Sequence, residues 1–70
     1  MDNIREMIGK NIREARKRQH MTLDELSAKA DVRVESITRY EHNRAAPNAV
    51  TLYHIAKALN VSADTLLGLN

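Results

Sequence analysis

Residues 31–44, DVRVESITRYEHNR, are compatible with two secondary structures. Their first half alternates valines with charged residues, which is typical of a strand, whereas Val34, Ile37 and Tyr40 recur every three residues, as on one face of a helix. A strand would place Ile37 on the polar face, and the rest of the chain offers no partner strand. The stretch is therefore predicted to form a helix over about residues 33–42, with Ile37 and Tyr40 facing inward.

The ends of this helix coincide with residues that stop one. Asp31 and Asn43 are among the few residues other than glycine that tolerate a left-handed backbone, and Pro47 prevents continuation soon afterwards. The helix before it is expected over about residues 23–30, so that only a tight turn around Asp31 separates the two.

The same periodicity predicts four helices besides this one, over about residues 3–19, 23–30, 49–59 and 63–67. The apolar residues of their helical faces, together with those that close the core, are Ile4, Ile8, Ile12, Ala15, Leu23, Leu26, Ala30, Leu52, Ile55, Ala56, Leu59, Val61 and Leu66. Thr22 and Glu25 have the spacing of a capping box, and Asn48 and Ser62 are suitable N-caps. The chain is expected to be all-α, with residues 1–70 forming one compact five-helix domain.

Composition narrows the class of protein. The 70 residues include no cysteine, which excludes disulfides and thiolate zinc sites, and the histidines at 20, 42 and 54 lack ligand spacing. No metal or cofactor is therefore expected. No glycine-rich phosphate loop or nucleophile in a recognisable site is present, so we do not expect an enzyme. The charged start MDNIREMIGK lacks a secretory apolar region and no apolar run is long enough for a membrane span, which favours a cytoplasmic protein without a membrane partner.

Basic residues are concentrated in the first predicted helix. Five of them lie between residues 10 and 18 against one acidic residue, Glu14, although the whole chain has a net charge of only +2. Such a stripe is typical of a phosphate-binding surface, but a solvated helix face has the same pattern. Charge alone leaves both interpretations open.

The helices predicted over 23–30 and 33–42 have the arrangement of a helix-turn-helix. The outer face of the second of them would carry Arg33, Val34, Glu35, Thr38, Arg39 and His42. Hydrogen-bonding side chains together with methyl groups match the pattern that base pairs present in the major groove of DNA.

The segments IGKNIREARKRQHMTLDELSAKADV, SITRYEHNRAAPN and LYHIAKALNVSADTLLG span residues 8–68 and resemble the Cro/repressor-type helix-turn-helix family of phage and bacterial regulators. The resemblance implies a lambda-repressor-like fold whose third helix enters the major groove of double-stranded DNA. We therefore expect a sequence-specific transcriptional regulator, in particular a repressor. A monomer this small has few base contacts, so we expect a homodimer on an inverted repeat with half-sites about one turn (~34 Å) apart. No small-molecule ligand is evident.

Carried over by position, the resemblance implies specific roles for individual residues. The base contacts would be Val34, Glu35, Thr38 and Arg39, and the backbone contacts would be Thr22, Leu23, Arg33, Arg44 and Arg16. Arg16 would also form a buried or semi-buried salt bridge with Glu41. Arg16 could serve only as the structural partner of Glu41, or it could contact a phosphate as well. Glu35 would need to accept from cytosine or pair with Arg39 one turn away.

The chain departs from the family pattern at three positions. Leu23 stands where the family usually has a glutamine that hydrogen-bonds near the DNA backbone, which places that phosphate contact in doubt. Asp31 and Asn43 stand at positions that are usually glycine, and both tolerate the left-handed backbone required there.

Two further expectations concern protein partners. The leucine-rich end of the chain suggests that Leu67 and Leu69 form a dimer contact, unless this segment packs on its own domain. Leu23 and Glu35 also permit an alternative function, in which the same fold serves as a protein-interaction module such as an antitoxin or the partner of an anti-repressor.

Overall fold

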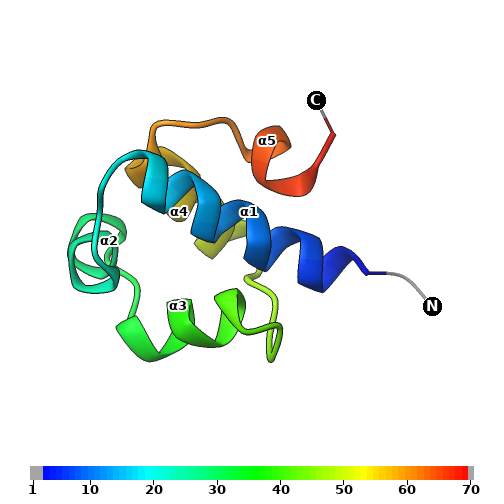
Figure 1. Cartoon of the computed structure of the whole chain (residues 1–70), viewed down its shortest axis with the longest axis horizontal. Helices are drawn as coiled ribbons and strands as arrows, with labels where there is room; N and C mark the ends of the chain where they lie inside the picture. Colours follow the sequence, from blue (N-terminus) through cyan, green and yellow to red (C-terminus); the bar gives the residue numbers. More distant parts are fainter. Residues whose placement is uncertain (1–2, 70) are drawn as a thin grey trace.

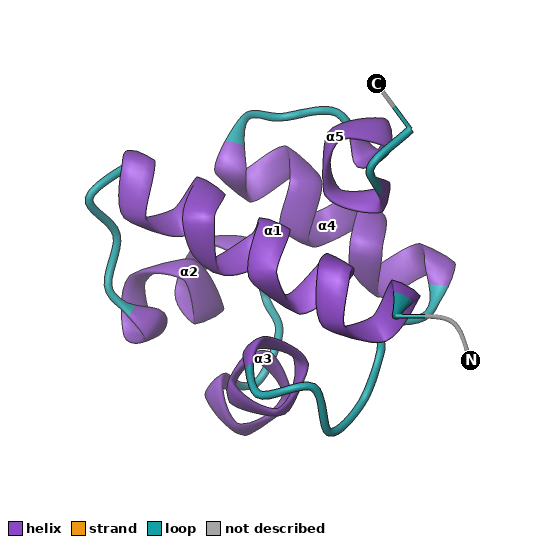
Figure 2. Ribbon diagram, turned by 45° about the vertical axis from the view of Figure 1, so that its right-hand side comes forward, coloured by secondary structure: helices purple, strands orange, loops and turns teal. Residues whose placement is uncertain are grey.

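The computed structural model describes residues 3–69, and within them it confirms the all-α fold (Figure 1; Figure 2). The helices are α1 (Ile4–Arg18), α2 (Leu23–Ala30), α3 (Val34–Glu41), α4 (Ala49–Leu59) and α5 (Ala63–Leu67). The expected ranges differ from these by one residue at most. Arg33 and His42, expected inside the third helix, instead flank α3 as its N-cap and C-cap.

Local hydrogen bonds explain where the helices begin. Thr22 Oγ1 accepts from the backbone N–H of Glu25 at 3.0 Å, and Glu25 Oε1 accepts from that of Thr22 at 2.8 Å, which completes the capping box. Asn48 and Ser62 accept through their side chains from the third residue of α4 and α5, at 2.8 and 3.1 Å. These caps satisfy amides that have no partner inside the helix.

Helix α1 lies across the middle of the molecule, with α4 behind it and with α3 and α5 on opposite sides (Figure 1). Helix α2 packs against α3 and α4. The core between the helices includes six large side chains with less than 2% exposure: Ile12, Leu26, Ile37, Ile55, Leu59 and Leu66. Burial of each such side chain contributes about 2 kcal/mol to stability, and these residues come from all five helices.

The two ends of the described chain show which apolar residues the core covers and which it leaves exposed. Helical periodicity predicts that Ile4 lies on the apolar face of the first helix, but Ile4 is 53% exposed. Helix α5 lies against α1 further along, where Asn11 Nδ2 donates to the carbonyl of Leu66 at 3.1 Å. Leu67 is half-buried against the core of its own chain, whereas Leu69 is 71% exposed. None of the helices between residues 3 and 69 is long and apolar enough to cross a membrane.

Candidate nucleic-acid interface

The turn between α2 and α3 fixes the direction in which α3 leaves α2. Asp31 ends α2 in the left-handed conformation, with φ 57° and ψ 44°. Ser27 Oγ donates to the carbonyl of Val32 at 2.6 Å, and the N–H of Val32 donates to the carbonyl of Ser27 at 3.2 Å. Two reciprocal bonds therefore tie the turn to the last residues of α2, and the orientation of α3 is set by local geometry.

Helix α3 has one buried and one polar face. Ile37 is fully buried, and Tyr40 packs half-buried against the core. The polar face combines exposed side chains with two half-buried ones: Arg33, Glu35, Arg39 and His42 are exposed, and Val34 and Thr38 are half-buried. Of the four residues expected to contact bases, Glu35 and Arg39 are therefore exposed, and Val34 and Thr38 lie at the border between the polar and the buried face.

Hydrogen bonding on this face decides what each side chain can offer. Thr38 Oγ1 donates to the carbonyl of Val34 at 2.9 Å, so its hydroxyl proton is used within the helix. What remains is a methyl group and an acceptor oxygen. Within residues 3–69, Glu35 and Arg39 form no ion pair with each other, although they stand one turn apart. The carboxylate and the guanidinium are both open to solvent.

Arg16 and Glu41, which the resemblance pairs, join α1 to α3. Arg16 Nε lies 2.8 Å from Glu41 Oε2, and Arg16 Nη2 donates to Glu41 Oε1 at 3.0 Å. Arg16 Nη1 donates to the carbonyl of Met21 at 2.9 Å, just before α2. The side chains are only 12% and 4% exposed. A forked arginine of this kind fixes three segments relative to one another.

The electrostatics of this pair follow from its burial. The hydrogen bonds that Arg16 donates to Glu41, with a smaller coulombic contribution from the same carboxylate, raise the pKa of Arg16 above its usual value, although burial acts in the opposite direction. All three guanidinium nitrogens already have protein partners. Arg16 is therefore placed to position α3 and has few donors left for a phosphate.

The start of α2 presents backbone rather than side-chain donors. Leu23 is half-buried and packs against the core, so its side chain offers nothing to a phosphate. Its N–H lies in the first turn of an α-helix, where backbone amides have no intrahelical partner. The exposed Thr22 uses its hydroxyl oxygen as the helix cap. An anion at this position would be bound mainly by amides and the helix dipole.

The loop after α3 brings a further cation to the same side. Arg44 is exposed, and its N–H donates to the carbonyl of Arg39 at 2.8 Å, which holds the loop against the end of α3. Thr38, Arg39, His42 and Arg44 together line one hollow. The loop therefore places a residue expected to contact the DNA backbone beside two expected to contact bases.

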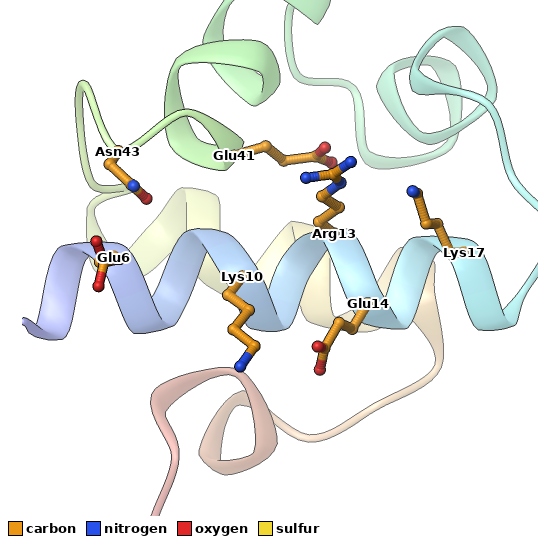
Figure 3. A pocket seen from close by; sticks show the side chains of 7 residues that line it. All are labelled: Glu6, Lys10, Arg13, Glu14, Lys17, Glu41 and Asn43. Atoms are coloured by element: carbon orange, nitrogen blue, oxygen red, sulfur yellow. The ribbon is translucent and has the colours of Figure 1, made fainter.

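The basic side chains of α1 point to two different sides of the helix. Figure 3 shows Arg13 and Lys17 on the side of α1 that faces Glu41, while Lys10 and Glu14 point to the opposite side. These side chains line a hollow along α1, in which carboxylates are interspersed with the cations. The lining residues are Glu6, Lys10, Arg13, Glu14, Lys17, Glu41 and Asn43. Only part of the stripe therefore adds positive charge on the α3 side.

Two residues without an assigned contact lie at this surface. Arg13 and His42 line a third hollow, between α1, α2 and α3, together with Arg16, Leu23 and Glu41. The signal for Arg13 in the sequence is its position three residues before Arg16, which puts both on one side of a helix. Among residues 3–69, no three histidine, aspartate or glutamate side chains come together in a way that could hold a metal ion.

Comparison with known proteins places this geometry among DNA-binding regulators. A family model described as helix-turn-helix matches residues 12–66. The chain is 30% identical over 60 residues to the uncharacterized HTH-type transcriptional regulator y4dJ of Sinorhizobium fredii, covering 86% of this chain and 78% of that protein. It is 33% identical over 61 residues to the HTH-type transcriptional regulator ImmR of Bacillus subtilis, covering 87% of this chain but only 48% of ImmR.

Solved structures share the fold closely. The restriction-modification controller protein C.AhdI from Aeromonas hydrophila superposes with a TM-score of 0.85 at 18% identity, over 89% of this chain and 94% of that one. The P22 c2 repressor, solved in complex with a synthetic operator, superposes with a TM-score of 0.83 at 30% identity, over 90% of this chain and 96% of that one.

Proposed function

This chain belongs to the helix-turn-helix family of DNA-binding transcriptional regulators, and from that premise we propose that it reads a specific double-stranded sequence with α3 in the major groove. The observation that carries the proposal is the outer face of α3. Exposed Arg39 and Glu35 stand beside half-buried Val34 and Thr38, on a helix held by the turn at Asp31.

Each side chain has a natural counterpart on a base edge. Arg39 can donate to O6 and N7 of guanine through two parallel hydrogen bonds, and Glu35 can accept from N4 of cytosine. Val34 and the methyl group of Thr38 can contact the methyl group of thymine. The absence of an ion pair between Glu35 and Arg39 in the described chain supports these separate roles.

Phosphate contacts would fix α3 in the groove. Arg33 and Arg44 flank the two ends of α3, and the start of α2 supplies a donor for a third phosphate. This donor is the N–H of Leu23, because the N–H of Thr22 is bound to Glu25. Arg16 acts in this proposal mainly as a positioning residue, because it is bound to Glu41 and to the backbone.

A single molecule of this size makes few base contacts, so we propose that two copies bind an inverted repeat. Half-sites about one turn apart (~34 Å) suit such an arrangement. A dimer that covers a promoter would act as a repressor by excluding other proteins. The likeness to the P22 c2 repressor, whose structure contains an operator, supports this form of regulation.

The test is selection of bound sequences from a random duplex library at about 100–150 mM salt, where non-specific attachment is weakened. We expect an enriched inverted repeat. A single enriched half-site would retain the regulator but contradict the dimer, and no enrichment would contradict sequence-specific binding.

Two arginine variants separate the roles on the selected site. Arg39→Ala should weaken DNA binding by about 1–3 kcal/mol and relax specificity at one base position. Arg44→Ala should weaken binding to all DNA sequences alike and reduce the slope of log affinity against log salt by about one. Lys57→Ala, which removes an exposed cation from α4, is the matched control and should bind normally.

A protein-interaction module is the second candidate, and one observation favours it. Val50 and Tyr53 of α4 are 67% and 56% exposed and stand one turn apart, so together they offer an apolar contact to a protein partner. Under this alternative, the double variant Arg39→Ala/Arg44→Ala would retain its protein partner in a pull-down, while Val50→Glu would lose it.

A further inference from the structure

His42 occupies a position between the two hollows of the DNA-facing side. It is the first residue after α3, and its ring is exposed. It lines the hollow that contains Arg39 and Arg44, and also the hollow between α1, α2 and α3 that contains Arg13. No other residue lines both.

One hydrogen bond determines the chemistry of this ring. His42 Nδ1 lies 2.8 Å from the carbonyl oxygen of Thr38. A carbonyl oxygen can only accept a hydrogen bond, so Nδ1 must carry the hydrogen. In a neutral imidazole the other nitrogen, Nε2, then has a lone pair and no hydrogen.

We propose that His42 is a proton-dependent contact for a DNA phosphate, made through Nε2. This inference rests on the proposed function, since it requires that the chain binds DNA with the α3 side. A neutral histidine without such a bond could place its hydrogen on either nitrogen and donate to a phosphate at any pH. His42 can donate through Nε2 only when the ring is protonated, because Nδ1 already uses the single hydrogen of the neutral form.

The charges around His42 favour an anion as the ligand. In one hollow the charged neighbours are Arg39 and Arg44, both exposed. In the other hollow α1 contributes Arg13 and Arg16, α3 contributes Glu41, and α2 contributes only the uncharged Leu23.

Arg16 and Glu41 neutralise each other through their bidentate contact, which leaves the arginines at 13, 39 and 44 as the net charge facing the ring. A phosphate supplies the negative charge that a protonated imidazole needs among these cations. The site is therefore cationic on both sides of His42, as a phosphate contact requires.

The pH dependence of DNA affinity is set by the protonation of His42. Only the protonated ring makes the contact, so DNA binding takes up a proton at His42. Affinity should therefore rise as pH falls and should fall as pH rises.

The experiment measures the dissociation constant by fluorescence anisotropy on a labelled duplex of about 20 base pairs with random sequence, because phosphate contacts are independent of sequence. Wild type, His42→Gln and the matched control His54→Gln are compared from about pH 8.5 to about pH 5.5. Glutamine keeps a polar side chain that does not titrate. His54 lies on α4 and is exposed.

Wild type and His54→Gln should bind about three- to tenfold more tightly at the acidic end, while His42→Gln should show no such gain. The slope of log affinity against log salt should be steeper for wild type than for His42→Gln by about 0.9 near pH 6, and equal near pH 8. Nitrogen NMR of the free protein near pH 8 should show hydrogen on Nδ1 of His42.

Equal pH dependence in wild type and His42→Gln, or hydrogen on Nε2 in the neutral ring, would overturn the proposal while leaving DNA binding intact. If wild type bound no duplex at any pH, the proposed function would fail, and this inference would fail with it.

Discussion

At the scale of single residues, the bidentate contact between Arg16 and Glu41 is a mostly buried ion pair that joins α1 to α3. Arg16→Ala would leave the Glu41 carboxylate, which is 4% exposed, without its partner. Removing one member of a buried ion pair is strongly destabilising, and we expect a loss of about 3 kcal/mol in the free energy of unfolding. Urea denaturation followed by circular dichroism measures it.

The pH dependence of this effect can be derived from the pKa of Arg16. Glu41 raises that pKa above the usual arginine value. A group whose folded pKa is raised contributes stability at every pH below its unfolded value, so the contribution is lost only in strongly alkaline solution. The cost of Arg16→Ala should accordingly stay constant between about pH 6 and about pH 9.

Two controls isolate the pair. Arg13→Ala removes an exposed cation from the same helix and should change stability by less than about 0.5 kcal/mol. Arg16→Met combined with Glu41→Leu removes both charges and should recover most of the loss. If Arg16→Ala alone were as stable as wild type, the contact would have no structural role.

At the scale of elements, the packing of α1 against α3 depends on Gly9. Gly9 is buried, and a Cβ atom at this position would collide with the carbonyl oxygen of Tyr40. The obstacle is backbone, which cannot rotate away as a side chain can, so α3 would have to shift.

Gly9→Ala should destabilise the fold by about 2 kcal/mol, although the same change at an exposed helical position stabilises by about 1 kcal/mol. A lower urea midpoint would therefore indicate that α1 and α3 are in close contact at Gly9, and a higher midpoint would indicate an uncrowded position. Lys10→Ala, at the next and exposed position, should be nearly neutral. A stabilised Gly9→Ala variant would show that α1 and α3 are not in close contact.

Element boundaries were accessible from the sequence because they depend on near neighbours in the chain. The capping box of Thr22 and Glu25 needs only residues three apart, and it is present. Asp31 and Asn43, which replace the family's usual glycines, have φ of 57° and 65° as expected. His20 also has a positive φ of 56°, which no motif signalled.

The exposure of apolar side chains near the ends of the chain could not be predicted from the sequence, because it depends on where neighbouring helices end. Helical periodicity puts Ile4 on the same face as Ile8, but it cannot say that α5 fails to cover the first turn of α1. For the same reason the sequence could not separate Leu67, which packs on the core, from exposed Leu69. The convergence of Arg13 and His42 likewise requires the folded arrangement of three helices.

At the scale of the whole molecule, the dimensions restrict how two copies can meet on DNA. The molecule measures 33 × 24 × 21 Å. Half-sites about one turn (~34 Å) apart bring two copies into contact most readily through an end of the long axis. The start of α1 and the segment after α5 both lie at one such end (Figure 1), and both carry exposed apolar residues, Ile4 and Leu69.

We expect Leu69→Glu to weaken dimerisation without unfolding the chain, because Leu69 is 71% exposed. Sedimentation equilibrium at high micromolar concentration should show a shift from dimer to monomer. Leu67→Ala should instead lower the free energy of unfolding by about 2 kcal/mol, because Leu67 packs against the core of its own chain.

The control for charge is Val50→Glu, which adds the same carboxylate to another exposed apolar position, on α4, and should leave the association unchanged. Equal dimerisation of Leu69→Glu and wild type would exclude this end of the molecule as the contact. If the wild-type chain is monomeric when free but binds an inverted repeat cooperatively, the two copies make this contact only in the DNA complex. In that case Leu69→Glu must abolish the cooperativity, since the two copies would then have lost their shared apolar surface.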